Sequence, residues 1–257
     1  MFVGHDDNSA LPMGWKPYEQ QRFIGAIRAL QEHHLVECAS TAQGTMILTP
    51  RALQRSVLRQ LDEDTPLRQQ VFQAATQMVH NVFPAQGLKN RGDPSTWAAS
   101  RISLTQVIRL NAAFTQCEPP IADDLHFAQL LSDTGNYLFN DGVQVEAVPI
   151  LETAEAVCNR LLKTDPMRVT PILTDTLGIL QIYNQFMGHP GRQRALQMTD
   201  RVLSICLDEL QGTPPDTWSE TDIIKVARSF VDRGCAHSQL NMMAEAGRDF
   251  DKALEYY

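Results

Sequence analysis

Residues 135–154 read GNYLFNDGVQVEAVPILETA, and residues 234–253 read GCAHSQLNMMAEAGRDFDKA. In each stretch an alanine follows the first glycine by 12 residues, a large apolar side chain follows it by 16, and a second alanine follows it by 19. Small residues at these intervals let two antiparallel helices approach closely, and the large side chain fills the space beside them. Gly142 suits the tight turn between the helices of the first stretch. The pattern predicts two helical hairpins.

A third, degenerate copy is expected between these two. Thr176-Leu177-Gly178 opens it, with Gly178 lying 43 residues after Gly135. The sequence MGHPGRQRAL at 187–196 predicts a turn that is five residues longer than in the other copies, so Ala195 takes the place of the small residue on the second helix. Hairpins repeated in this way indicate an array in which each unit packs on its neighbours.

The sequence ends within the second helix of its third predicted hairpin. Phe250, Ala253 and Leu254 give this helix an apolar stripe that no later residue covers. We therefore expect an array that has been shortened, with a stripe that favours self-association.

These residues resemble the tetratricopeptide repeat family, in which small, turn, alanine, large and alanine positions follow one another in a helix-turn-helix unit. The stretch DGVQVEAVPILETAEAV is similar to the longer kinesin-light-chain type, where a proline follows the first alanine by two residues, as Pro149 follows Ala147. The resemblance implies an all-α superhelix whose first helices line a concave groove for a peptide or partner domain. The implied groove residues are Gln129, Ser132, Asn136, Asn140, Asp175, Ile179, Arg228, Val231 and Ser238.

Asn136 is the strongest single candidate among them. In the resembled family an asparagine at this place holds the backbone of the ligand through its amide, which can donate and accept a hydrogen bond at once.

The front of the chain predicts a helix, a short β-hairpin and a second helix. The first helix spans Gln21 to His34, the two strands span 35–38 and 45–48, and Thr49-Pro50 is a good start for the second helix. This order is typical of a small winged-helix-like unit. We assign it to residues 18–64, after a flexible lead-in at 1–17 that is rich in Gly, Pro and Asp.

Residues 65–118 are expected to form a helical connector. Its helices span about 67–83 and 97–114, with the break PAQGLKNRGDPST between them. The repeats then occupy residues 119–257, with about three hairpins, of which the last is truncated.

The order of these segments resembles the region that follows the nucleotide-binding domain in fungal NB-ARC/STAND receptor-like proteins. The matching segments are LQEHHLVECASTAQGTMILTPRALQRSVLRQL, RQQVFQAATQMVHNVFP, Trp97 and FAQLLSDTGNYLFNDG. Pro50 stands where that family usually has a histidine before Arg-x-x-Gln, and the ATPase half is missing. The resemblance implies a regulatory remnant that binds the ATPase half of a relative.

Bulk composition narrows the class of protein. The chain has 257 residues, a formal net charge of −8 and a sequence pI near 5.3, which speaks against general binding to nucleic acid or to anionic membranes. Its five cysteines are widely spaced and form no CxxC pair, which favours a reducing cytoplasm over a disulfide framework. The acidic N-terminal stretch is not a secretory signal, and no segment is apolar enough to span a bilayer.

No residue set predicts a reaction, a cofactor or a metal site. Gly87-LKNR-Gly92 has Walker-like glycines, but Asp93 stands where the phosphate-binding lysine is needed. His33 and His34 point about 100° apart on a helix and cannot easily share one ion. Cys235 and His237 show no third group to orient them as a nucleophile and base.

Arg51, Arg55 and Arg59 form one basic stripe on the second predicted helix. The stripe can contact phosphates as a recognition helix does, or it can contact another domain. The acidic run at 62–64 follows at once and weighs against nucleic acid.

We therefore expect a cytoplasmic, non-enzymatic scaffold that binds a protein or peptide through its repeats, without a cofactor. The alternatives are the regulatory remnant, which would bind a STAND-type ATPase homologue or a second copy of itself, and a winged-helix nucleic-acid-binding protein.

Overall fold

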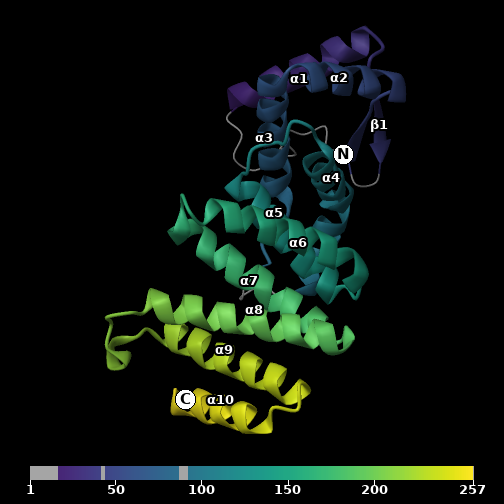
Figure 1. The fold of residues 1–257 in the computed structure, drawn as a ribbon. Helices are drawn as coiled ribbons and strands as arrows, with labels where there is room; N and C mark the ends of the chain where they lie inside the picture. The colour runs from purple at the N-terminus through teal and green to yellow at the C-terminus, as the bar shows by residue number, and fades with distance from the viewer. Residues whose placement is uncertain (1–16, 42–43, 87–91, 257) are drawn as a thin grey trace. The chain divides into compact units, whose positions relative to one another are not determined.

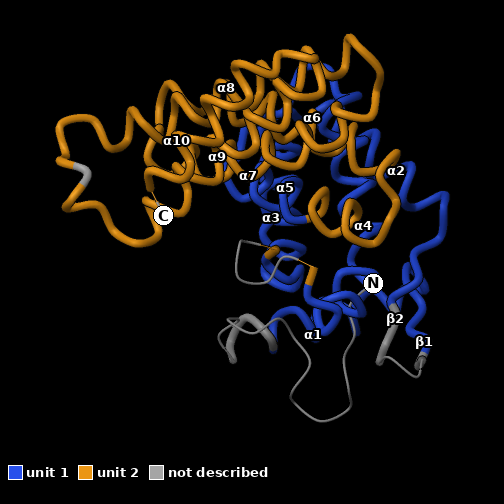
Figure 2. The backbone as a smooth tube through the Cα atoms, turned by 90° about the horizontal axis from the view of Figure 1, so that it is seen from below, with its two compact units in different colours: residues 1–85, 93–133 blue, residues 86–92, 134–257 orange. Residues whose placement is uncertain are grey.

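The computed structural model describes residues 17–41, 44–86 and 92–256. Within these residues the chain forms ten α-helices, two short strands and two 3-10 turns, so the predicted all-α class is confirmed. The chain divides into two compact units, shown in Figure 2. Unit 1 comprises 1–85 and 93–133, and unit 2 comprises 86–92 and 134–257, so the division falls inside a helix.

Unit 1 begins with helix α1 (Pro17–Glu32), strands β1 (Glu37–Thr41) and β2 (Gly44–Leu48), and helix α2 (Arg51–Glu63). The strands pair antiparallel, with Glu37 opposite Leu48 and Thr41 opposite Gly44, so the first strand lies two to three residues later than predicted. The predicted order of helix, hairpin and helix is confirmed. A compact winged-helix-like unit would bury one side of α2, but no side chain of α2 is buried.

The core of unit 1 lies between α3 (Thr65–Val82), α4 (Trp97–Gln116) and the start of α5 (Leu125–Asn140), with the 3-10 turn η1 (Pro94–Thr96) before α4. The rings of Phe72, Phe114 and Phe127 pack with centroids 4.8 to 5.9 Å apart. Asp64 caps α3 by accepting a hydrogen bond from the backbone N–H of Leu67, at 2.9 Å. The predicted connector helices are thus confirmed, with ends within two residues.

The segment between α4 and α5 is held against α3 by a buried arginine. The guanidinium of Arg68 donates to the carbonyl oxygens of Glu118 and Pro119, at 3.2 and 2.5 Å. The side-chain oxygen of Gln69 accepts from the backbone N–H of Ala122, at 2.8 Å. These bonds satisfy backbone groups that the helices leave unpaired.

Unit 2 holds the end of α5 and five further helices. They are α6 (Gln144–Leu161), α7 (Pro166–Gln185), α8 (Gly188–Glu209), α9 (Glu220–Gln239) and α10 (Met243–Glu255), with the 3-10 turn η2 (Pro215–Thr217) before α9. From α6 onward each helix packs against the next one along the chain, and Figure 1 shows α8, α9 and α10 as successive layers. Asp165 caps α7 and Ser219 caps α9 through their side-chain oxygens.

The close approaches expected in the first and last hairpins are present. A methyl group at Gly135 would lie 2.3 Å from Cγ of Leu151, and one at Gly234 would lie 2.6 Å from Cε1 of Phe250. Both distances are far below a normal contact, so only a glycine fits without movement of its neighbours. The alanines at 147, 154, 246 and 253 are all buried.

The turns of these two hairpins also match. Gly142 has φ +83°, and the N–H of Val143 donates to the carbonyl of Leu138 at 2.9 Å. Asn241 takes the same left-handed conformation at φ +61°, and the N–H of Met242 donates to the carbonyl of His237 at 3.0 Å. Each turn therefore closes its first helix with the same 6→1 hydrogen bond, and an asparagine replaces the glycine in the second case.

The middle hairpin differs from its prediction. Its expected long turn is short, because α8 begins at Gly188 and residues 188–195 are helical. Gly178 faces open space, so it is not the close-packed residue of this copy. That residue is Gly191, where a methyl group would lie 2.4 Å from the carbonyl oxygen of Asn184. Ala195 is fully buried, as expected of the small residue on the second helix.

None of the helices in the described part of the chain combines the length and apolar content that crossing a bilayer requires.

Candidate functional site

Asn136 and Asn140 lie together at the end of α5, and both contact the chain itself. Asn136 is buried, and its Nδ2 donates to the carbonyl oxygen of Gln86 at 3.2 Å. The Nδ2 of Asn140 donates to the backbone oxygen of Asn136 at 2.8 Å and approaches its Oδ1 at 3.3 Å. The amide that was expected to hold the backbone of a ligand thus holds the backbone of this chain. Asn136 is therefore not an open contact point in this arrangement.

The other predicted residues of α5 belong to unit 1. The Nε2 of Gln129 donates to Oδ2 of Asp133 at 3.0 Å, and Ser132 is buried. Ser132 is therefore withdrawn from solvent, whereas Gln129 is half-buried and its amide is paired within α5.

The α7 residues divide between the surface and the core. Asp175 is half-buried, whereas Ile179 is buried. α7 is largely buried along its middle. Among its half-buried residues, Asp175, Gly178 and Ile182 follow one another at helical spacing, while Met167 and Pro171 near its start are exposed. Nothing lies within 4 Å of the place where a side chain of Gly178 would begin, so this glycine borders open space. The repeat spacing predicts that Gly178 is a close-packed residue of the middle hairpin, so it gives no sign that Gly178 lies at the surface.

The three predicted residues of α9 also differ in exposure. Arg228 is exposed and pairs with Asp232 one turn later, with Nε and Oδ2 3.9 Å apart. Ser238 is half-buried, and its hydroxyl points to the sulfur of Met243 at 3.9 Å. Val231 packs against the apolar cluster that contains Leu203 and Phe230. Arg228 and Ser238 are accessible, and Val231 serves packing.

The ends of α7 and α9 are joined by side chains. The Nε2 of Gln239 donates to Oε1 of Gln185 at 2.9 Å, and Nη1 of Arg192 on α8 donates to the backbone oxygen of Gln239 at 3.2 Å. Both helices also pack against α8. Their accessible residues thus lie on neighbouring elements, and we name this set the α7–α9 face: Asp175, Gly178, Ile182, Arg228, Cys235 and Ser238.

The chemistry of the α7–α9 face is that of a binding surface. It carries a carboxylate, a guanidinium, a hydroxyl and an apolar side chain, together with the open position at Gly178. Burial, and next the charge of Asp232, raises the pKa of Cys235, so its thiol is protonated at neutral pH and is a poor nucleophile. His237 lies two residues further along α9 and therefore on a different side of the helix.

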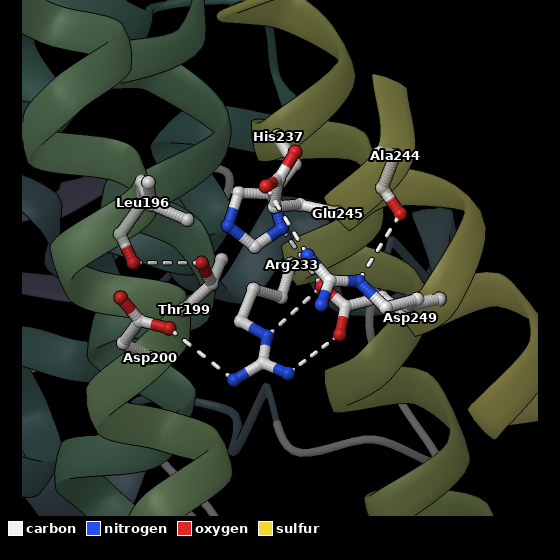
Figure 3. Close-up of polar contacts among 9 residues, drawn as sticks. Leu196, Thr199, Asp200, Arg233, His237, Ala244, Glu245 and Asp249 are labelled. Atoms are coloured by element: carbon white, nitrogen blue, oxygen red, sulfur yellow. Dashed lines mark hydrogen bonds and ion pairs between the residues drawn. The ribbon is translucent and has the colours of Figure 1, made fainter. Parts of the chain in front are cut away.

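A buried ionic network fixes α9 against α10 behind this face. Figure 3 shows Arg233 and His237 converging on Asp249. Arg233 donates from Nε and Nη2 to the two oxygens of Asp249, at 3.0 and 2.5 Å, and Nδ1 of His237 lies 2.9 Å from Oδ2. Asp200 on α8 adds a longer contact to Nη1 of Arg233, at 3.4 Å.

The contacts of this network shift the pKa values of Asp249 and Arg233. Burial acts to raise the pKa of Asp249, but the hydrogen bonds from Arg233 and His237 and their charges outweigh it and hold that pKa below its ordinary value. The hydrogen bonds that Arg233 donates to Asp249 raise the pKa of Arg233 in turn. The pair is therefore ionised at neutral pH, and it orients α9 without facing solvent as a reactive group.

Asp249 is not among the residues predicted from the sequence, although its spacing from Arg233 and His237 indicates the contact. Asp249 follows Arg233 by 16 residues and His237 by 12, the same spacings that link Gly234 to Phe250 and to Ala246. The first hairpin has Thr134, Leu138 and Ile150 at the corresponding positions. The contact between the two helices of the hairpin is thus polar and charged in the last hairpin, whereas it is largely apolar in the first.

The three arginines of α2 belong to unit 1. Arg51, Arg55 and Arg59 are all exposed on the same side of the helix.

Within the described residues, no three of the His, Cys, Asp and Glu side chains are grouped in a way that could hold a metal ion. Comparisons with family models, with curated proteins and with solved structures find no match to this chain.

Proposed function

We propose that the protein is a non-enzymatic protein–protein interaction scaffold of the cytoplasm. In this proposal α5 to α10 are three tetratricopeptide-like hairpins, and they bind a peptide or a partner domain through the α7–α9 face.

The observation that carries the proposal is the repeated contact register of the first and last hairpins. The pairs Gly135–Leu151 and Gly234–Phe250 have the same spacing, the same close approach and the same 6→1 turn bond. Stacked hairpins expose one side of each first helix along the array, and repeat proteins bind their partners on such surfaces.

The α7–α9 face supports this proposal in its composition. Its charged side chains, Asp175 and Arg228, are accessible, and neither belongs to the buried ionic network. Binding through such side chains gives specificity by charge, and the apolar Ile182 adds contact area.

Capture from an extract of the native organism tests the proposal. The wild-type chain and the variants Asp175→Lys and Arg228→Glu are immobilised, and retained proteins are compared by quantitative mass spectrometry. The matched controls are Asp208→Lys and Lys252→Glu, which make the same charge changes at exposed positions of α8 and α10. We expect at least one protein that the wild type and both controls retain and both face variants lose. An identical set on all five chains would contradict binding through this face.

The regulatory alternative makes a different prediction. If the chain binds the ATPase half of a STAND-type relative, that relative should co-purify with it, and the contact should persist in Arg228→Glu. The nucleic-acid alternative predicts a salt-dependent gel shift that Arg55→Glu abolishes.

A further inference from the structure

One side of α10 lies open to solvent, and we name it the α10 outer face: Met243, Gly247, Asp251 and Leu254. At about 100° per residue these four positions fall within about 80° of one another, so they share one side of the helix. All four are exposed, with 60% of Met243 and 71% of Leu254 accessible. Nothing lies within 4 Å of the place where a side chain of Gly247 would begin. Figure 1 shows α10 as the last of the three layers that α8, α9 and α10 form.

The repeat register identifies the same face on α8. The buried alanine at the start of the second helix is Ala195 in the middle hairpin and Ala246 in the last one, 51 residues later. The same offset relates two residues of α8 to two residues of the α10 outer face: Asp200 to Asp251, and Leu203 to Leu254. The charge and the apolar side chain are thus the same at both places.

On α8 this face is covered by α9. Leu203 is 3% exposed and lies in one apolar cluster with Val226 and Phe230 of α9. Oδ1 of Asp200 lies 3.4 Å from Nη1 of Arg233, also on α9. The helix that covers this face of α8 therefore supplies an apolar pair and a cation.

The equivalent carboxylate on α10 has no countercharge. The other charged side chains of α10 form ion pairs with one another or with α9. Asp251 takes part in none of the ion pairs found among the described residues, and it lies beside the exposed Leu254 on the same side of the helix.

We propose that the α10 outer face binds an amphipathic helix of a partner protein that repeats the contact pattern of α9. The pattern is an apolar residue, a second apolar residue four positions later, and an arginine seven positions after the first, as in Val226, Phe230 and Arg233. On a helix these positions fall within about 60° of one another and form a single contact side. The arginine binds Asp251, and the apolar pair covers Leu254.

Other occupants fit this face less well. Two copies of the face placed against each other would bring together two carboxylates of Asp251 and no cation from the face itself. The helix of a second copy that has the required pattern, α9, already packs between α8 and α10 of its own chain. An anionic membrane surface or a nucleic acid would be repelled by the same carboxylate.

The α10 outer face shares no residue with the α7–α9 face. Its binding therefore does not depend on the function proposed for that face, and its test can fail or succeed independently.

Peptide binding to the full chain tests the proposal. The probe is a fluorescent peptide with the sequence of residues 220–239, with serine in place of Cys235 and a lactam bridge on its other side that holds it helical. A second peptide differs from it only by Arg233→Glu. We expect the arginine peptide to bind at least tenfold more tightly than the glutamate peptide by fluorescence anisotropy, with an affinity that falls as salt is added.

Variants of the chain locate the contact. Asp251→Arg and Leu254→Ser should each weaken the arginine peptide at least tenfold, and Asp251→Arg should improve binding of the glutamate peptide, because the charges are exchanged. Asp208→Arg makes the same charge change at an exposed position of α8 and serves as the matched control, with no change expected. Asp175→Lys on the α7–α9 face should also leave binding unchanged, and circular dichroism checks that each variant is folded.

Three results would overturn the proposal. They are failure of the arginine peptide to bind, binding that Asp251→Arg and Leu254→Ser leave unchanged, and a dimer of the chain in sedimentation that Leu254→Ser dissociates and the peptide does not. The last result would assign the α10 outer face to a second copy of the chain.

Discussion

Gly135 on α5 lies against Leu151 on α6 so closely that a methyl group on the glycine would be 2.3 Å from Cγ of the leucine. Leu151 is 1% exposed and has no free space to move into. Gly234 makes the equivalent approach to Phe250, but Phe250 is 37% exposed and its ring can swing outward. The same sequence position thus tolerates a methyl group differently in the two hairpins.

We expect Gly135→Ala to destabilise the protein by about 2 kcal/mol, because the added methyl group overpacks a filled core. Gly234→Ala should cost less than about 1 kcal/mol, since the ring yields and alanine favours the helix. Urea unfolding followed by circular dichroism measures both. The double variant Gly135→Ala/Leu151→Ala should be more stable than the sum of the single changes implies. Equal costs at the two glycines would show that exposure of the facing side chain is not decisive.

Gly191 and Gly178 form a second matched pair, within one hairpin. A methyl group at Gly191 would lie 2.4 Å from the backbone oxygen of Asn184, which cannot rotate away, whereas nothing lies within 4 Å at Gly178. Gly191→Ala should therefore destabilise by about 3 kcal/mol, and Gly178→Ala should stabilise by about 0.5 to 1 kcal/mol through helix propensity. Thermal and urea unfolding distinguish the two. A stabilising Gly191→Ala would contradict the close approach of α8 to the end of α7.

Asp249→Asn should destabilise the last hairpin by about 2 kcal/mol at neutral pH, because Arg233 loses its countercharge in a mostly buried place. Arg233 keeps about a quarter of its side chain exposed, which limits the cost. The control is Asp251→Asn, an exposed position on the same helix, where we expect no measurable change.

The loss of stability in Asp249→Asn should depend on pH in a defined direction. Since the pKa of Asp249 is lowered in the folded protein, its contribution to stability is fully present above the ordinary value of 3.8 and is lost as the pH falls through the lowered value. The difference in unfolding free energy between the wild type and Asp249→Asn should thus be constant from pH 5 to 7 and should shrink toward pH 3. A difference that grows on acidification would contradict the ion pair.

His80 makes the stability of unit 1 depend on pH in the mildly acidic range. Burial, and next the charge of His126 with its ring centroid 5.3 Å away, lowers the pKa of His80, while Asp124 and a hydrogen bond with Asn81 act in the opposite direction. The unfolded chain therefore binds a proton near pH 6.5 that the folded chain binds only at lower pH, and stability falls as the pH drops below 6.5.

Removing either histidine should reveal this effect. The loss of stability between pH 7.5 and 5.0 should be smaller in His80→Gln than in the wild type. His126→Gln should raise the pKa of His80, as measured by NMR titration of its ring proton, because a like charge is removed. An unchanged titration of His80 would show that burial alone sets its pKa.

The sequence predicted those parts of the fold that local signals control. Apolar periodicity predicted the connector helices to within two residues. The first and last hairpins were predictable because their glycine, turn and alanine positions recur at fixed spacings. The middle hairpin was not, because a glycine can mark a close approach or an open surface, and Gly178 and Gly191 carry no local signal that separates the two.

The candidate site was less predictable for a related reason. The accessibility of Asn136 depends on the carbonyl of Gln86, fifty residues away in the chain, and no local pattern specifies that contact. Ile179 and Gly178 are neighbours on α7, yet only the packing of the surrounding helices decides that the isoleucine is buried and the glycine accessible.

The ionic network of the last hairpin also bears on how the helices find their partners during folding. The first and last hairpins share one spacing of small and large residues, so α10 could in principle pair with α5, and α6 with α9. Such an exchange would bury Asp249 against Leu138 and leave Arg233 facing Ile150, and a buried charge without a countercharge costs several kcal/mol. The salt bridge thus favours the pairing of α10 with α9 over its pairing with α5. In this way it disfavours wrong helix pairings in a chain whose hairpins share one spacing.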